Sequence, residues 1–81
     1  MVKYDYKVQG KKRKALADII AEILGEPAEY LKAPSYSYRI GEAFTVTREG
    51  VLEVGEADEE QINAVLNALQ TAGYELTAQA V

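Results

Sequence analysis

The sequence has 81 residues, 48% of them hydrophobic, and a formal net charge of −4 at neutral pH. This length indicates one domain, residues 1–81, with enough apolar side chains for a core. Cysteine and histidine are absent, which excludes disulfides, thiolate metal sites and the nucleophilic dyads and triads that use those residues. We therefore expect a protein that is not an enzyme, with no cofactor and no bound metal.

The charges are unevenly distributed along the chain. Residues 1–14 carry six cations and one anion, whereas residues 15–81 carry three cations and twelve anions. An acidic whole makes general nucleic-acid binding unlikely, while a basic corner indicates a more local contact. No apolar run reaches the ~18–20 residues of a membrane span. The opening MVKYDYKVQG also lacks the apolar region of a signal peptide. We expect a soluble, cytoplasmic protein with no membrane contact.

The chain opens with a strand and a helix. Residues 2–9 alternate between apolar and polar side chains, which predicts a strand that ends at Gly10. Residues 11–24 predict an amphipathic helix, because apolar side chains recur at helical spacing. Gly25 and Pro27 end this helix. Its apolar stripe consists of Leu16, Ile19, Ile20, Ile23 and Leu24.

The middle of the chain predicts an antiparallel meander. A short edge strand at 29–31 is open as an alternative to a loop. Three strands should follow, at 36–40, 43–47 and 51–54. Gly41-Glu42 has the glycine-first pattern of a two-residue type II′ hairpin turn. We expect the third and fourth strands to turn Phe44, Val46, Leu52 and Val54 inward.

A second helix follows the meander. Asp58 and Gln61 have the spacing of a capping box, and Glu59 and Glu60 suit the positive end of the helix dipole. Its apolar stripe is Ile62, Val65, Leu66 and Leu69, and Gly73 closes it. Residues 74–81 alternate weakly, so they either add a strand or fray as a terminus.

These patterns predict an α+β fold in the order β-α-β-β-β-α, with a final strand as an open possibility. The expected architecture is a two-layer sandwich, an antiparallel or mixed sheet with both helices on one face. A ferredoxin-like βαββαβ arrangement is the alternative if the tail pairs. Tyrosines 4, 6, 36 and 38 should face the helices, which argues against a base-stacking platform. The opposite face should carry Lys3, Asp5, Lys7, Ser37, Arg39, Thr45 and Thr47.

The run Lys11, Lys12, Arg13 and Lys14 is the candidate binding site. Cations in the first turn of a helix oppose its dipole, so they call for an explanation. One explanation is a solvated turn. The other is an anion site, in which these side chains and free backbone N–H groups meet a phosphate or an acidic partner, with Lys3 or Lys7 nearby. The acidic cluster of Glu56, Asp58, Glu59 and Glu60 is better explained by helix capping than by a metal site.

A protein–protein module is the alternative function. Small sheets expose edge strands to which a partner strand can add, and residues 29–31 or 51–54 are candidate edges. Weak homodimerisation would also enlarge a small core. The partner is therefore either an anionic one at the basic corner or an unknown protein at a sheet edge.

Four segments carry a family resemblance: YKVQG at 6–10, RKAL at 13–16, PSYSYRIG at 34–41 and FTVTREGVL at 44–52. They resemble small uncharacterised proteins from prophage and mobile-element regions of Gram-positive bacteria, some of which are labelled virulence-related. The resemblance extends over residues 3–73. The family label states no biochemical activity, so the resemblance carries none over to this chain. It does imply that residues 74–81 could begin a part present in longer relatives.

Overall fold

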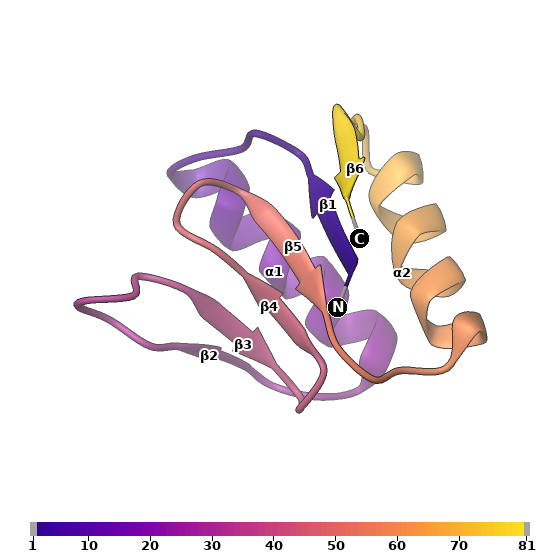
Figure 1. Cartoon of the computed structure of the whole chain (residues 1–81), viewed down its shortest axis with the longest axis horizontal. Coiled ribbons are helices and arrows are strands. Elements are labelled where there is room, and N and C mark those ends of the chain that lie inside the picture. The colour runs from indigo at the N-terminus through magenta and orange to yellow at the C-terminus, as the bar shows by residue number, and fades with distance from the viewer. Residues whose placement is uncertain (1, 81) are drawn as a thin grey trace.

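The computed structural model describes residues 2–80 and contains two helices and six strands (Figure 1). In chain order the elements are β1 (Val2–Asp5), α1 (Lys11–Leu24), β2 (Ala28–Tyr30), β3 (Tyr38–Ile40), β4 (Phe44–Val46), β5 (Val51–Val54), α2 (Glu59–Thr71) and β6 (Ala78–Ala80). The α+β class and the order of elements are confirmed, and both optional strands form.

The strands make one antiparallel sheet in the order β2-β3-β4-β5-β1-β6. β2 to β5 form the predicted meander, and β1 closes against β5. The tail pairs with the far side of β1, where Ala78 lies opposite Asp5. Because the tail pairs as β6, the condition for the ferredoxin-like alternative is met: β1, β4, β5 and β6 lie in the antiparallel order β6-β1-β5-β4 of a βαββαβ unit, and β2 and β3 extend the sheet beyond β4.

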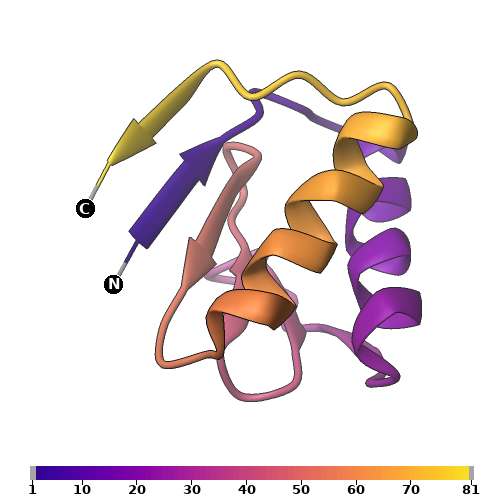
Figure 2. The same ribbon diagram turned by 90° about the vertical axis from the view of Figure 1, so that its right-hand side faces the viewer.

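Both helices lie on one face of the sheet, as predicted (Figure 2). The core between the two layers is built from strand and helix side chains that alternate or recur at the expected spacing. Its buried members are Tyr4, Tyr6, Leu16, Ala17, Ile20, Ile40, Phe44, Val46, Leu52, Val54, Val65 and Leu69. The four predicted inward positions of β4 and β5 are all among them.

The helix boundaries follow the sequence closely, but the exposure of Ile23 and the start of α2 differ from prediction. α1 begins and ends where its pattern predicts, and Gly25 takes the left-handed C-cap conformation with φ 68°. Ile23 of the predicted stripe is 45% exposed, because it lies at the margin of the contact surface rather than under it. The capping box is wrong: Asp58 is the N-cap residue of α2, but its exposed carboxylate makes no cap hydrogen bond.

The first strand is shorter than its alternating pattern. β1 ends at Asp5, although Tyr6 still donates its N–H to the carbonyl of Gly50, one step beyond the Asp5–Val51 pair. The backbone leaves the sheet at the next residue. Lys7 follows with a positive φ of 50°, and its N–H is bound by the Asp5 carboxylate at 3.0 Å. The alternation of apolar and polar side chains continues past Lys7, but the backbone hydrogen bonds between strands do not.

The β2–β3 hairpin differs most from prediction. Tyr36 lies in the connection, not in a strand, with φ 52° and 38% exposure. The N–H of Tyr36 donates to the carbonyl oxygen of Lys32 at 2.7 Å, so this N–H cannot also pair with a neighbouring strand. Ser37, expected on the open face, is buried. The β3–β4 connection has three residues rather than two, because Ile40 pairs with Phe44.

The face turned away from the helices, called the open face below, is polar. The strand register lines up one residue from each of five neighbouring strands across it, in the order Glu29, Arg39, Thr45, Glu53 and Lys3. Lys3 and Glu53 form an ion pair at 3.7 Å. This row carries no aromatic side chain, so it offers no platform for stacking bases.

Candidate anion-binding site

One end of the sheet collects most of the positive charge of the chain. This end holds the first turn of α1, the segment that follows β1, the β2–β3 connection and the β4–β5 turn, on the left in Figure 1. We call it the basic end, because seven of the nine Lys and Arg residues lie there. They are Lys7, Lys11, Lys12, Arg13, Lys14, Lys32 and Arg48.

Arg13 ties three segments of the basic end together. Its guanidinium donates hydrogen bonds to the carbonyl oxygens of Tyr36 and Thr47, the latter at 3.5 Å. It also lies over the ring of Tyr38, 4.9 Å from the ring centre. This half-buried side chain is therefore committed to holding the two hairpin connections against α1, and it is not presented to a partner.

The other three residues of the predicted site divide further. Lys14 pairs with Asp18 one turn along the helix, at 3.0 Å, and this pair raises the pKa of the lysine. Lys11 and Lys12 are exposed. The structure thus separates the predicted four into two exposed cations, one exposed ion pair and one structural arginine.

The start of α1 lacks a side-chain cap. Gly10 is the N-cap residue with φ 62°, no side chain caps the described first turn, and that turn contains no acidic residue. The Gly10 carbonyl accepts the N–H groups of Arg13 and Lys14 at 3.1 and 3.3 Å. The positive end of the helix dipole therefore adds to the charge of Lys11 and Lys12.

Sequence reasoning missed two cations, Lys32 and Arg48. They come from separate hairpin connections, and only the antiparallel pairing of β2 to β5 brings both to the start of α1. Arg48 lies over the ring of Tyr36 at 5.3 Å. Of the two optional contributors, Lys7 lies at this end, whereas Lys3 is on the open face beside Glu53. Strand directions could have predicted this grouping from the turn positions alone.

Three residues other than glycine have a positive φ, and all three lie at the basic end. Lys7, Lys32 and Tyr36 have φ of 50°, 56° and 52° among the residues described. Such conformations cost roughly 1 kcal/mol each for residues that carry a Cβ. Backbone strain concentrates at functional sites more often than elsewhere, so its position here agrees with the clustering of charge.

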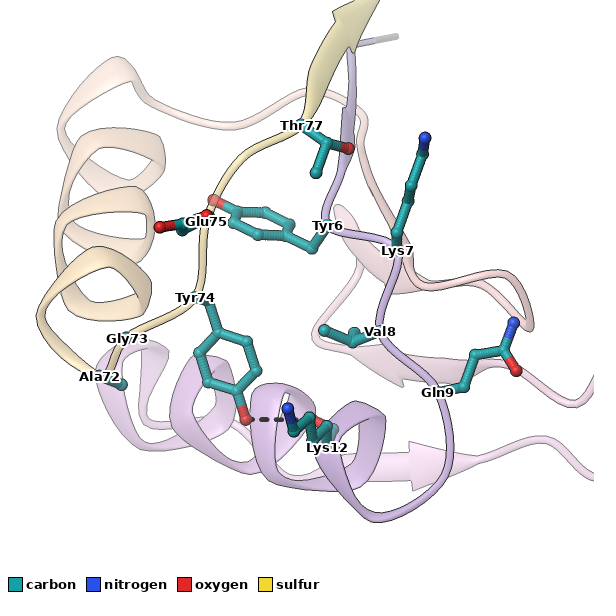
Figure 3. Close-up of a pocket in the computed structure, with 10 residues that line it drawn as sticks. All are labelled: Tyr6, Lys7, Val8, Gln9, Lys12, Ala72, Gly73, Tyr74, Glu75 and Thr77. Carbon is teal, nitrogen blue, oxygen red and sulfur yellow. Dashed lines mark hydrogen bonds between the residues drawn. The ribbon is translucent and has the colours of Figure 1, made fainter.

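A groove opens beside Lys12, between the two helix ends (Figure 3). It has a volume of about 590 Å³ and lies between the segment after β1, the first turn of α1 and the segment after α2. Figure 3 shows the rings of Tyr6 and Tyr74 on its walls. The side chain of Val8 points into the groove from the segment that follows β1. The remaining lining residues are Lys7, Gln9, Lys12, Ala72, Gly73, Glu75 and Thr77.

The segment from Gly73 to Thr77 forms one wall of this groove and is anchored at both ends. At one end, the Tyr74 hydroxyl donates to the carbonyl of Lys12 at 3.0 Å. At the other, the N–H and the hydroxyl of Thr77 both donate to the carbonyl of Asp5, at 2.8 and 2.7 Å. The wall is thus attached to α1 and to β1, which fixes the width of the groove.

The opposite end of the sheet is acidic. The connections at 25–27, 41–43 and 55–58 and the start of α2 contain no Lys or Arg. They carry Glu26, Glu42, Glu56, Asp58, Glu59 and Glu60. Within residues 2–80, no three acidic side chains come together as a metal site would require. The charge asymmetry of the sequence therefore becomes a separation of charge along the strands.

Comparisons with known proteins add no relative to this picture. No family model, no curated protein and no solved structure matches the chain. No described helix is both long and apolar enough to cross a membrane.

Proposed function

We propose that the protein is a non-enzymatic binding domain that takes an anionic partner at its basic end. The observation that carries this proposal is the gathering of cations from four separate segments around the uncapped start of α1. Lys11 and Lys12 are the principal contacts, because both are exposed and lie nearest the helix start. Lys7, Lys32 and Arg48 extend the positive surface on either side.

The acidic remainder of the molecule favours a defined partner over an extended polyanion. A nucleic acid that runs past the basic end would meet the negative charge of the body, and like charges repel over a Debye length of about 10 Å at 0.1 M salt. A short acidic segment of another protein fits within the basic end and avoids that repulsion.

A titration with hexaglutamate tests this proposal. The ¹⁵N amide signals of residues 10–14, Lys32 and Arg48 should shift at low salt and return as salt rises. A K11Q/K12Q variant should bind about fivefold or more weakly, since each exposed ion contact contributes roughly 0.2–1 kcal/mol.

The matched control is K3Q/R39Q, which removes the same net charge from the open face. This control should retain affinity within about twofold, as expected for contacts this distant. Equal weakening of both variants would mean that hexaglutamate responds to overall charge, and the basic end would lose its special role.

A second candidate is a protein–protein module, such as a dimerisation domain in a phage or mobile-element protein. The observation that favours it is the outer edge of β2, which pairs only with β3; Tyr30 at its end and Leu31 directly after it are exposed. An added strand could bind there. The other expected edge, residues 51–54, is wrong, because β5 lies between β4 and β1. Sedimentation equilibrium over a range of concentrations distinguishes a monomer from a dimer, and a monomer at all concentrations would remove the homodimer.

A further inference from the structure

The groove beside Lys12 has features that a macromolecular anion does not need. Its volume of about 590 Å³ lies within the ~300–1,000 Å³ typical of small-molecule sites. A second hollow of about 470 Å³ adjoins it and shares Tyr6, Tyr74 and Glu75. Leu66 and Leu76 line this second part, so the joined space becomes more apolar away from the lysines.

We propose that this groove binds a small molecule that joins a flat apolar or aromatic body to one anionic group, such as an aryl phosphate or an aryl carboxylate. The proposal goes beyond the protein partner of the basic end, although Lys12 belongs to both sites. The body lies against the ring of Tyr74 and the small exposed part of Tyr6, and the anionic group faces Lys12.

The walls support this orientation of the ligand. Tyr6 and Tyr74 offer aromatic surface, which packs well against another flat ring. Lys12 supplies the cation, and the first turn of α1 adds its dipole, whereas the side chain of Lys7 points away from the groove (Figure 3). Glu75 is the one acidic side chain of the lining, and its negative charge disfavours a second anionic group at the far end of the ligand.

The tyrosine hydroxyls differ in what they offer. That of Tyr74 is already donated to the carbonyl of Lys12, so this residue contributes its ring. The hydroxyl of Tyr6 keeps its proton across the neutral range, because burial and then the neighbouring Tyr4 raise its pKa. It can therefore act as a hydrogen-bond donor to a ligand in either part of the groove.

The test is an NMR titration of the intact chain with three probes: phenyl phosphate, inorganic phosphate and benzyl alcohol. Phenyl phosphate should produce saturable shifts in residues 7–9 and 73–77, with an affinity at least tenfold above that of either fragment. Lys12→Gln should weaken phenyl phosphate binding about two- to fivefold, since it removes one exposed ion contact. Lys14→Gln is the matched control, since it removes a cation of the same helix turn whose ammonium pairs with Asp18 outside the groove.

A second variant examines the apolar wall. Val8→Ser should weaken phenyl phosphate and leave inorganic phosphate unchanged, with the amide spectrum reporting that the fold is retained. The proposal is overturned if phenyl phosphate binds no better than inorganic phosphate, if its shifts centre on residues 10–14, or if no saturable shift occurs up to about 10 mM, tenfold above a millimolar dissociation constant. Hexaglutamate binding in the same samples would, in each of these cases, leave the proposed function of the basic end standing.

Discussion

The guanidinium carbon of Arg13 lies 4.9 Å from the ring centre of Tyr38, and the same group donates to the carbonyls of Tyr36 and Thr47. One side chain of the basic run thus connects α1 to both hairpin connections. Tyr30 packs on the same tyrosine, with ring centres 4.9 Å apart. The result is a short stack, Arg13–Tyr38–Tyr30, that reaches the edge of the sheet.

Removing this arginine should destabilise the fold rather than only weaken binding. We expect Arg13→Ala to lower the free energy of unfolding by about 1–3 kcal/mol, because hydrogen bonds from charged groups and a cation–π contact are lost. Urea unfolding followed by circular dichroism measures the change. Lys14→Ala, which removes only an exposed ion pair, should leave the free energy of unfolding nearly unchanged. Equal effects of the two variants would show that Arg13 is as dispensable as its neighbour.

Gly50 should tolerate no side chain. It has φ 83°, and a Cβ built there would lie 2.3 Å from the carbonyl oxygen and 2.4 Å from the nitrogen of Val8. We expect Gly50→Ala to cost about 2–4 kcal/mol, since the clash with backbone adds to the conformational penalty. Gly25→Ala is the comparison, with a similar φ of 68° and open space around it, and should cost only about 1 kcal/mol. Thermal unfolding of the two variants gives the difference.

The two isoleucines of α1 should respond differently to truncation. Ile20 is fully buried, and Ile20→Ala should lower the free energy of unfolding by about 2–4 kcal/mol through lost burial and a cavity. Ile23 is 45% exposed, so Ile23→Ala should cost less than about 1 kcal/mol. Denaturant midpoints with unchanged m-values provide the comparison. A large loss at Ile23 would instead place that side chain in a contact surface.

Stability should decline at alkaline pH through Tyr6. Burial, followed by the neighbouring Tyr4, raises the pKa of Tyr6 above its ordinary value of 10.0. The folded state therefore holds this proton more tightly than the unfolded state, so the contribution is complete below pH 10 and is lost as pH rises through the folded pKa. Unfolding free energies measured between pH 8 and 11 should fall less steeply in Tyr6→Phe than in the wild type. A wild-type slope in Tyr6→Phe would contradict this assignment.

The helices were predictable because their signals are local. The apolar stripe of α1 and the glycine at its end fix both boundaries without reference to the sheet. The same holds for β5, which is confined between turn residues at 48–50 and Gly55. In contrast, the ends of β1 and β3 depend on backbone turns that the alternating pattern does not reveal. Lys7 takes a positive φ directly after Tyr6, and the N–H of Tyr36 donates to the carbonyl of Lys32 in a turn.

The binding site was predictable as a charge pattern but not as a surface. The run at 11–14 identified the correct end of the helix, yet nothing in its sequence distinguishes the role of Arg13 from that of Lys12. That distinction arises because Arg13 points toward β3 while Lys12 lies beside the groove. The groove itself is formed by segments about 60 residues apart that only the tail brings together, as the bond from Tyr74 to Lys12 shows.

The pairing of β1 with β6 determines from which end of the sheet a tag, a linker or a fused domain extends. Lys3 lies opposite Ala80, at the end of the sheet where β5 leads into the acidic connection at 55–58. A tag, a surface linker or a fused domain joined at either terminus would thus extend from the side opposite Lys11 and Lys12. Immobilised through either terminus, the chain would present its positively charged side to solution, which makes capture assays a direct way to search for its ligand.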